Sequence, residues 1–511
     1  MAVAVTRAGA PTVIAPDAAA FLSCDPASHE RLRGYAVAVA DAVAGALTDA
    51  GPCPARDPAR LAAAIAAIDP CPLEGLPFDD VVAQLRDEVL ANGVRPADPF
   101  CAAHLQPPTL MSAAAAELAI GATNQSLDSF EGSPAATFAE DHLVRWLARM
   151  LGFPHGSGVL TSGGTAGNLL GLLLARECAS RRRSAGGDAP AEPTAGLPPE
   201  AARWRIITST GAHDSIRRSA HLLGLGTSAV LGVATDAAGR IDIAALDSTL
   251  DALTLARLTP IAIVATAGTT DLGAIDPLGA IADRADACGA WLHVDAAVGS
   301  AFALSERLAP LLDGIERADS ITADLHKLWF MPIGASALLV PDIGLLRAVR
   351  HHSDYLNRPE DEADGMLNLV GRSLDTSRRF DALKILVGLR TTGRRRLAAM
   401  VEHLVALARS AGEQVAAHPE LELLAPPSTV TVVFRWRPPD ERLGADALDA
   451  ANVAAQRALF RGGRALVGRT RLDGRVALKL TLVNPLAGFD DMRGLLEIVA
   501  ATARAAHDDR G

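Results

Sequence analysis

Residues 261–340 have the sequence IAIVATAGTTDLGAIDPLGAIADRADACGAWLHVDAAVGSAFALSERLAPLLDGIERADSITADLHKLWFMPIGASALLV, and this stretch decides the fold. It holds three short apolar runs separated by helical patterns, and each run ends in polar residues. The first run ends at Thr269 and Thr270, the second at Asp295, and the third at His326 and Lys327. Short apolar runs that alternate with helical patterns are typical of βα units. The stretch therefore predicts an α/β fold with a mainly parallel sheet.

The patterns on both sides of this stretch predict three parts. Residues 1–105 have helical spacing that is interrupted by prolines, and they show no obvious chemistry. Residues 106–395 contain the alternating strands and helices of a large domain. Residues 396–511 contain two strand patterns, STVTVVFRW and GRVALKLTLVN, with a helix at 445–461 between them. These last elements predict a small C-terminal α/β domain.

Composition excludes several classes of protein. The 511 residues are enough for two or three domains, and the net charge of -11 argues against general nucleic-acid binding. No apolar run approaches the roughly 20 residues that span a bilayer, and the N-terminus lacks a secretory pattern. The six cysteines are scattered without metal-binding spacing. We therefore expect a cytoplasmic protein with no metal and no membrane or nucleic-acid partner.

A candidate anion site lies in SGVLTSGGTAGNLLGLLLAR, residues 157–176. A short apolar run enters a turn rich in Gly, Ser and Thr, and a helix follows. Free backbone N–H groups and the positive end of the helix dipole favour an anion at such a point, here at Gly164 and Thr165. The turn matches neither a Walker loop nor a GxGxxG turn. A plain helix cap is the alternative interpretation.

His213 follows the strand pattern RWRIITST and lies where the next helix begins. Ligands of open α/β sheets bind at the carboxyl ends of the strands, so His213 is a candidate ligand-contacting residue. An exposed histidine near a helix start is the alternative.

Other segments allow both a functional and a structural interpretation. The loop Asn124 to Pro134 either lines a pocket or only connects two helices, and Ser133 is expected to cap the helix that starts at Pro134. The acidic run from Glu360 to Asp364 either attracts a cationic substrate or is a solvated loop, and we favour the loop. Residues 181–200, rich in Gly, Pro and Ala, predict a surface insertion.

The chemistry of the central stretch points to pyridoxal phosphate (PLP). Asp295 ends an apolar strand, so we expect a buried carboxylate that needs a partner, and the ring N–H of PLP is a suitable one. Lys327 supplies the amine that PLP enzymes join to the cofactor. Gly164 and Thr165 would take the phosphate, and the His213 imidazole would stack on the ring. A plain salt bridge of Lys327 with Asp295 or Asp324 is the alternative.

The chain resembles the group II PLP-dependent amino-acid decarboxylases, which are fold-type I enzymes. The resemblance extends from about His104 to Pro485 and rests on LTSGGTAGNL, GAHDSIRRSA, IVATAGTTDLGAIDPL, WLHVDAAVG, DLHKLWF, SRRFDALKILVGLRTTG and GRTRLDGRVALKLTLVNP. It is most similar to the branch of diaminobutyrate and siderophore-type lysine decarboxylases. The resemblance implies a large domain with a seven-stranded-type sheet, and a homodimer with its active site at the subunit interface.

The resemblance also implies roles for individual residues. Lys327 would be the Schiff-base lysine, Asp295 the partner of the ring nitrogen, and His213 the ring-stacking residue and a candidate for proton transfer. Ala297 would pack on the other face of the ring. The remaining cofactor contacts would be Gly164, Thr165, Thr269, Asp324 and His326.

The implied reaction is decarboxylation of an L-amino acid to its amine, with a diamino acid such as 2,4-diaminobutyrate, lysine or ornithine as the favoured substrate. The aromatic decarboxylases protonate the reaction intermediate with a loop tyrosine, whose position here falls near Leu369; the chain has only Tyr35 and Tyr355. Val298 and Met331 also depart from the commoner residues. An aldehyde-forming or aminotransferase-like PLP enzyme is therefore the alternative, and a catalytically idle homologue that acts as a binding partner is the non-enzyme alternative.

Overall fold

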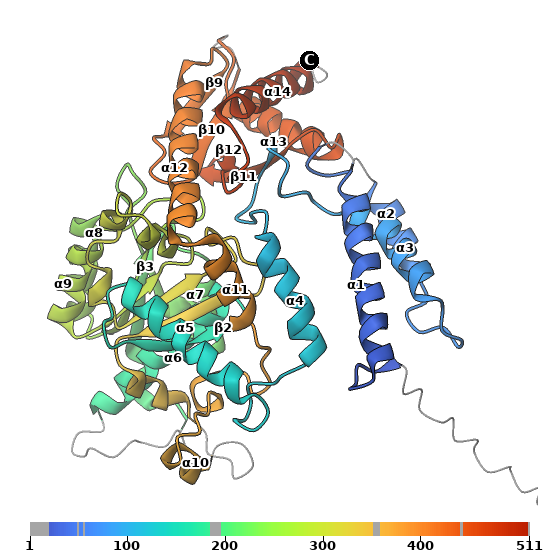
Figure 1. Ribbon diagram of the computed structural model, residues 1–511. Coiled ribbons are helices and arrows are strands. Elements are labelled where there is room, and N and C mark those ends of the chain that lie inside the picture. Colours follow the sequence, from blue (N-terminus) through green and yellow to red (C-terminus); the bar gives the residue numbers. More distant parts are fainter. Residues whose placement is uncertain are drawn as a thin grey trace, which may run out of the picture. The chain divides into compact units, whose positions relative to one another are not determined.

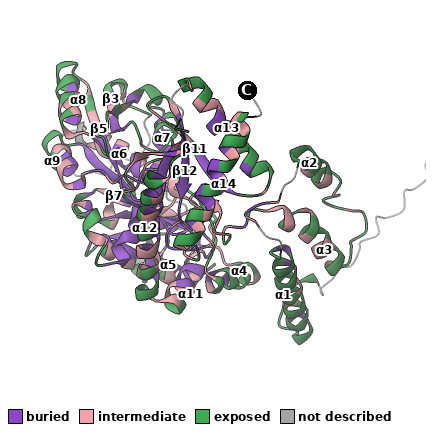
Figure 2. Ribbon diagram, turned by 90° about the horizontal axis from the view of Figure 1, so that it is seen from above, coloured by how far each residue is buried: buried purple, intermediate pink, exposed green. Residues whose placement is uncertain are grey.

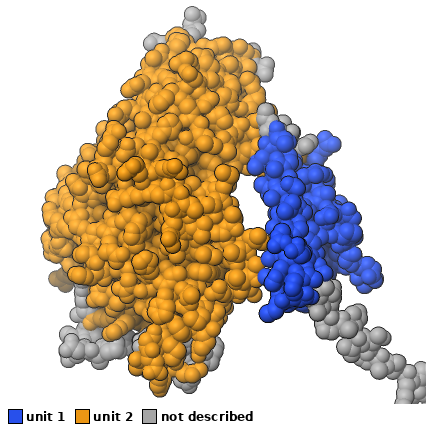
Figure 3. Space-filling view, in the orientation of Figure 1, with its two compact units in different colours: residues 1–49, 58–92 blue, residues 50–57, 93–511 orange. Residues whose placement is uncertain are grey.

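The computed structural model describes residues 20–48, 51–54, 57–183, 196–350, 358–439 and 443–508. The chain forms two compact units, Met1–Asp49 with Pro58–Asn92 and Ala50–Asp57 with Gly93–Gly511 (Figure 3). The second unit contains all the residues that were singled out for chemistry. Most of the predicted insertion at 181–200 lies outside the described residues, and so does Tyr355.

The first unit is a small group of helices, α1 (Pro26–Ala46), α2 (Pro58–Ala66) and α3 (Phe78–Glu88). Asp25 caps α1, because its side chain accepts a hydrogen bond from the Ala27 N–H, and Pro26 occupies the first helical position. The Tyr35 ring of α1 stacks on Phe78 of α3 with the ring centroids 3.8 Å apart. The expected helical N-terminal segment is therefore present.

The second unit is built on a seven-stranded sheet with the order β2-β8-β7-β6-β5-β3-β4. Within it, β8 is antiparallel to both of its neighbours, and the other strands run parallel to one another. The prediction of a mainly parallel seven-stranded sheet is confirmed. The strands are β2 (Ser157–Thr161), β3 (Trp204–Ser209), β4 (Val230–Val233), β5 (Thr259–Thr266), β6 (Trp291–Asp295), β7 (Ser320–Asp324) and β8 (Ser336–Val340).

Helices cover both faces of this sheet, so its strands are buried (Figures 1 and 2). Successive side chains of a strand point to opposite faces. Trp291 accordingly joins the core beside α6 and α7, whereas Leu292 and Val294 join the core on the other face. The helices of this part are α4 (Met111–Thr123), α5 (Pro134–Met150), α6 (Gly164–Arg183), α7 (Ser215–Leu222), α8 (Ile243–Leu255), α9 (Leu278–Cys288), α10 (Pro359–Ala363) and α11 (Ala382–Thr392).

A second, five-stranded sheet of order β1-β11-β12-β10-β9 packs with α12 (Arg394–Ala417), α13 (Ala445–Arg461) and α14 (Phe489–Asp508). The bounds of α13 agree with the predicted helix. The short strand β1, Cys101–Ala102, lies in a segment predicted to hold only helices and connectors, and it pairs in parallel with β11. Two residues are too short for a strand period, so no sequence pattern marks them. The other strands are β9 (Leu421–Ala425), β10 (Thr431–Trp436), β11 (Leu466–Leu472) and β12 (Arg475–Thr481).

The predicted start of α5 is half right. Pro134 is the first residue of the helix, as expected. Ser133 makes no side-chain capping bond, because its backbone has φ -163° and ψ 62°, and its buried hydroxyl has no partner among the described residues. Across the described ranges, no helix is long and apolar enough to cross a membrane.

Helix α6 lies close to the sheet because glycines line its inner face. A Cβ atom added at Gly167 would lie 2.8 Å from the Thr322 side chain, and one at Gly171 would lie 2.6 Å from the His293 ring. The spacing from Gly167 to Gly171 places both on one face of the helix. The close approach brings Asn168, which lies between them in sequence, against β6.

We therefore expect Gly171→Ala to destabilise the protein by about 1–3 kcal/mol, the usual cost of overpacking a core. Gly121→Ala is the matched control, because Gly121 also lies inside a helix but a Cβ there would have no atom within 4 Å. The control is expected to be neutral or stabilising by about 0.5–1 kcal/mol. Thermal unfolding of both variants measures the difference, and equal melting temperatures would contradict the close packing of α6.

Candidate active site

A cavity of about 260 Å³ opens where the parallel strands end. Residues that follow β2, β3, β5, β6 and β7 converge on it, because the carboxyl ends of parallel strands meet at one edge of a sheet. This volume is close to the lower limit of about 300 Å³ for ligand pockets in proteins, so a small cofactor suits the cavity better than a large ligand. The lining residues are Ser162, Gly163, Gly164, Thr165, Asn168, His213, Thr266, Gly268, Thr270, Asp295, Ala297, Val298, Asp324, His326, Lys327 and Ile333.

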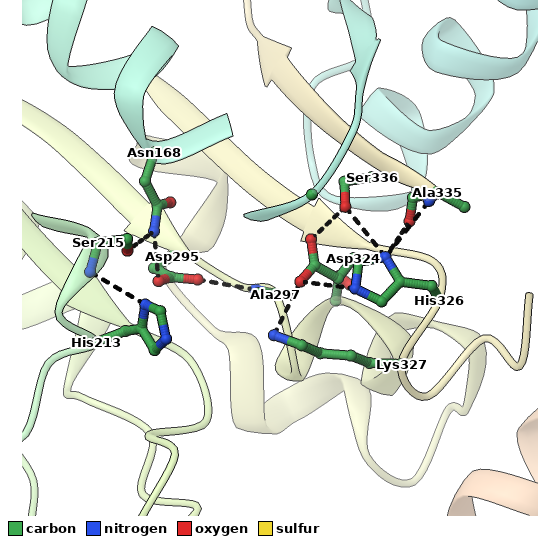
Figure 4. Close-up of polar contacts among 12 residues, drawn as sticks. Asn168, His213, Ser215, Asp295, Ala297, Asp324, His326, Lys327, Ala335 and Ser336 are labelled. Carbon is green, nitrogen blue, oxygen red and sulfur yellow. Dashed lines mark hydrogen bonds and ion pairs between the residues drawn. The ribbon is translucent and has the colours of Figure 1, made fainter. Parts of the chain in front are cut away.

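Asp295 is the last residue of β6 and is only 6% exposed. Its Oδ2 accepts a hydrogen bond from Asn168 Nδ2 at 2.8 Å, and its Oδ1 accepts one from the Ala297 N–H at 3.1 Å (Figure 4). Both donors are neutral. Among the described residues, Asp295 has no ion-pair partner, so a buried negative charge faces the cavity without a countercharge.

Lys327 makes its ion pair with Asp324, not with Asp295. Its Nζ lies 2.8 Å from Asp324 Oδ2, and Ser336 donates its hydroxyl to Asp324 Oδ1 at 2.5 Å (Figure 4). His326 Nδ1 lies 3.0 Å from the Ala335 carbonyl oxygen and 3.4 Å from the Ala335 backbone nitrogen, so the ring is held against this residue. The Lys327 amine is thus held at the cavity by a buried carboxylate that itself has a second donor.

The N-terminus of α6 forms another wall of the cavity. The N–H groups of Ala166 and Gly167 donate to the Gly163 carbonyl, whereas those of Gly164 and Thr165, at the start of the helix, have no acceptor among the described residues. A Cβ at Gly163 would meet no atom within 4 Å, so there is open space in front of these groups, whereas one at Gly164 would lie 2.9 Å from Asp324 Oδ2. Thr165 adds its side chain to the same wall. This arrangement suits a phosphate group.

His213 lies on the opposite side of the cavity from Lys327 in Figure 4, two residues before α7 starts. Its Nδ1 accepts a hydrogen bond from the Ser215 N–H at 3.2 Å. A backbone N–H can only donate, so Nδ1 is unprotonated in this arrangement and Nε2 is left for other partners.

Thr269 is the one predicted cofactor contact that does not line the cavity. It is buried, and its hydroxyl accepts the Ala274 N–H at 3.0 Å, which stabilises the turn after β5. Thr266 and Thr270, on either side of it in sequence, reach the cavity instead. The sequence offered no means of deciding between these threonines, because the chain turns sharply after β5.

Of the other segments and residues singled out in the sequence, only Val298 lines the cavity among the described residues. The loop 124–134 contacts the segment 368–379, since Leu127 donates to the Arg378 carbonyl and Phe130 to Asn368 Oδ1. The prediction of a solvated acidic loop is wrong for Asp361, which is 7% exposed and accepts from the Asn368 amide. Val298 lines the cavity, whereas the Met331 side chain packs against Gly388.

Sequence reasoning missed Asn168 and His293. The Asn168 amide donates to both Asp295 and Ser215, and its oxygen lies 3.0 Å from His293 Nε2. His293 precedes Asp295 by two residues on β6, so the two side chains share a face of the sheet. That spacing, and the position of Asn168 one turn after Gly164, were the available signals.

Burial lowers the pKa of His293 to about 4, while the nearby Asp295 charge opposes the shift. Between pH 6.5 and 4, His293 is therefore neutral in the folded state, whereas a histidine in the unfolded state, with a pKa near 6.5, is mostly protonated. As the pH falls through this range the unfolded state binds the proton first. The stability that neutral His293 contributes is present above pH 6.5 and is lost toward pH 4.

We expect the wild type to lose up to about 3 kcal/mol of stability relative to His293→Gln between pH 6.5 and 4. Asp276 acts in the opposite sense, because burial raises its pKa to about 6, but both proteins contain it and its contribution cancels. Melting temperatures of the two proteins across this range measure the effect. A difference that stays constant with pH would contradict it.

The comparisons with known proteins fit this geometry. Residues 68–437 match the family model described as the pyridoxal-dependent decarboxylase conserved domain. The chain belongs to this family. The decarboxylase is 41% identical to an L-2,4-diaminobutyrate decarboxylase of Rhizobium meliloti, over 86% of this chain and 84% of the relative. It is 36% identical to one from Acinetobacter baumannii, over 85% and 86% of the two chains.

Solved structures agree with the family assignment. The glutamate decarboxylase domain of a diaminobutyrate-pyruvate transaminase and L-2,4-diaminobutyrate decarboxylase from Vibrio parahaemolyticus superposes with a TM-score of 0.85 at 34% identity, covering 95% of this chain and 98% of that chain. Oryza sativa TDC, solved with PLP and tryptamine, gives a TM-score of 0.84 at 26% identity, covering 95% and 99%. The decarboxylase is thus a fold-type I PLP enzyme, as predicted.

The residues around the cavity fit PLP. The unpaired Asp295 carboxylate suits the ring N–H, the open helix N-terminus suits the phosphate, and the Lys327 amine suits the aldehyde carbon. The buried Thr266 hydroxyl, which also lines the cavity, has no hydrogen-bond partner in the described part of the chain. A polar ligand would satisfy it.

Proposed function

We propose that this enzyme decarboxylates an L-amino acid whose side chain carries a second amino group, with L-2,4-diaminobutyrate as the first candidate. The observation that carries the proposal is the meeting of Lys327 and Asp295 in one cavity of a chain from this family. The choice of substrate is supported by the two relatives of 36% and 41% identity, both named for L-2,4-diaminobutyrate. Lysine and ornithine are the other diamino acids of the same class.

The proposed work of the chain's own residues follows from their geometry. PLP, when bound, supplies an electron sink for the bond between the α-carbon and the carboxylate. Lys327, whose Nζ lies 2.8 Å from Asp324 Oδ2, would bind the cofactor's aldehyde carbon. Asp295 would hold the ring N–H. Gly164 and Thr165 would hold the phosphate at the start of α6.

His213 is the proposed ring-stacking residue and the candidate for moving a proton to the α-carbon. It lines the cavity, and its Nδ1 already accepts from Ser215, so Nε2 is the nitrogen left to carry or deliver a proton. The loop tyrosine of the aromatic decarboxylases has no counterpart near Leu369, which is itself 2% exposed. Ala297 would leave room for the ring on its other face.

A homodimer and a cytoplasmic location belong to the same proposal. Helix α1 leaves Val39 and Val43, which share one face of the helix, 45% and 42% exposed. An apolar helix surface of this kind is usually covered by a partner, and a second copy of the chain would cover it. Light scattering of the holoenzyme measures the mass, and a monomer would contradict this part.

The experiment that tests the reaction supplies the PLP-loaded enzyme with 2,4-diaminobutyrate, lysine, ornithine, glutamate and an aromatic amino acid. Mass spectrometry of the products and carbon dioxide release are followed together. We expect carbon dioxide and the corresponding diamine from one diamino acid. Aldehyde with ammonia would indicate the aldehyde-forming alternative, turnover of only the other amino acids would exclude the substrate class, and no turnover would favour an idle homologue.

A further inference from the structure

A chain of buried hydrogen bonds leads from Asp295 through Asn168, which also lines the cavity, to residues that do not line it. Asn168 donates to Asp295, His293 lies next to Asn168, and Ser320 Oγ lies 2.8 Å from His293 Nδ1. The Trp291 indole N–H then donates to Ser320 Oγ at 2.8 Å. All five residues are at most 6% exposed, so water does not compete for these bonds.

The direction of every bond in this chain can be worked out from its two ends. The Asp295 carboxylate only accepts, so the Asn168 amide N–H₂ faces it and the amide oxygen faces His293. An amide oxygen also only accepts, so His293 Nε2 must carry a proton. The lowered pKa of His293, about 4, keeps the ring neutral, and Nδ1 therefore accepts the Ser320 O–H. Ser320 in turn accepts the Trp291 N–H, which can only donate.

The strands and α6 hold these hydrogen-bonded residues in place. His293 is in register with Ser320 across the β6–β7 pair, and it shares its sheet face with Asp295. Asn168 is brought against both by the glycine face of α6, where a Cβ at Gly171 would already collide with the His293 ring. Both N–H groups of the Asn168 amide are used, one on Asp295 and one on Ser215. The amide cannot turn over without breaking three bonds.

We propose that Asn168 and His293 are positioning residues, which together fix the Asp295 carboxylate as the acceptor for the cofactor's ring nitrogen. Asn168 holds Oδ2 and the Ala297 N–H holds Oδ1, so the carboxylate is fixed at the cavity wall, and each oxygen can still accept a further hydrogen bond. His293 acts only through Asn168 and touches neither cofactor nor substrate. This inference rests on the proposed role of Asp295.

The test compares His293→Leu with His293→Gln. Both remove the imidazole and fill a similar volume, but only glutamine places an amide N–H₂ near the position of Nε2, where it can donate to Asn168. For His293→Leu we expect the dissociation constant of PLP to rise about tenfold and kcat to fall by a similar factor, with KM nearly unchanged, the scale of one lost buried hydrogen bond. For His293→Gln we expect both values within about threefold of the wild type.

Two spectroscopic measurements complete the test. In the wild type labelled with ¹⁵N-histidine, with His293→Gln used to assign its signals among the 13 histidines, His293 should be neutral and protonated on Nε2. With PLP labelled at its ring nitrogen, the ¹⁵N shift should indicate protonation in the wild type and a weakened hydrogen bond in His293→Leu. The tautomer measurement needs only the wild type and the better-behaved variant, so it holds even where leucine impairs folding.

The outcomes separate the two levels of the proposal. A proton on His293 Nδ1, or equal effects of His293→Leu and His293→Gln on PLP binding, would overturn the positioning role of Asn168 and His293. The proposed role of Asp295 as the partner of the ring nitrogen would be unaffected by that result. A ring-nitrogen shift that is the same in Asp295→Asn as in the wild type would instead overturn the role of Asp295.

Discussion

Lys327→Ala removes the yellow absorbance of the bound cofactor and lowers decarboxylation by about 10³-fold or more. The proposed covalent attachment needs a primary amine, and Lys327 is the only one that lines the cavity formed by the described residues. Loss of a proton-transfer group alone costs about 10²- to 10⁴-fold, and the alanine variant also loses the covalent site. Absorbance after addition of PLP and carbon dioxide release measure the two losses.

Lys327→Arg separates the amine from its charge. Alanine leaves Asp324, 2% exposed, without its cation, whereas arginine keeps a positive charge beside it. We expect the arginine variant to melt close to the wild type and yet be as inactive as the alanine variant. An active, yellow arginine or alanine variant would exclude Lys327 as the attachment site.

Asp295→Asn lowers kcat by about 10²- to 10³-fold, the range found when one preorganised electrostatic partner is removed from an active site. The amide has nearly the same shape, but it is neutral and cannot balance a protonated ring nitrogen. In the wild type, Asn168 and the Ala297 N–H each donate to one oxygen of this carboxylate. In the variant, one of these donors would face the N–H₂ group of the new amide, which cannot accept its hydrogen bond. Weaker PLP binding is expected for the same reason.

Asp295→Glu is the matched control, since it keeps the charge and changes only the reach of the side chain. We expect it to retain more activity than the asparagine variant, and a measurable hydrogen bond to the ring nitrogen. If the asparagine variant matches the wild type in kcat and in the dissociation constant of PLP, the proposed partnership of Asp295 with the ring nitrogen is excluded.

The convergence of the candidate residues was predictable because it depends on topology alone. Once residues 261–340 are assigned to parallel strands, the residues that follow those strands must meet at one edge of the sheet. Lys327, Asp295, His213 and Gly164 accordingly line the same cavity. Alternating strand and helix patterns are why a mainly parallel sheet and α13 were expected where they lie, whereas the number of seven strands was implied by the family resemblance.

What could not be predicted depends on distances between side chains from different elements. The ion pair of Lys327 could have formed with Asp295 or with Asp324, and only the packed turn after β7 selects Asp324. The side chain of Thr269 turns into its own loop, because its hydroxyl bonds to Ala274. Such choices are worth a few kcal/mol each at most, and they leave no periodic trace in the sequence.

The sequence alone was enough for the fold class, for the family resemblance and for placing Asp295 and Lys327, at the ends of successive strands, on one edge of the sheet. These features follow from hydrophobic period and chain order, which are local properties. Only the tertiary structure decided that Asn168 and His293 support Asp295, and that Asp324 holds Lys327. Those contacts join residues up to 127 positions apart, and they exist because glycines let α6 approach the sheet until buried polar groups had to pair.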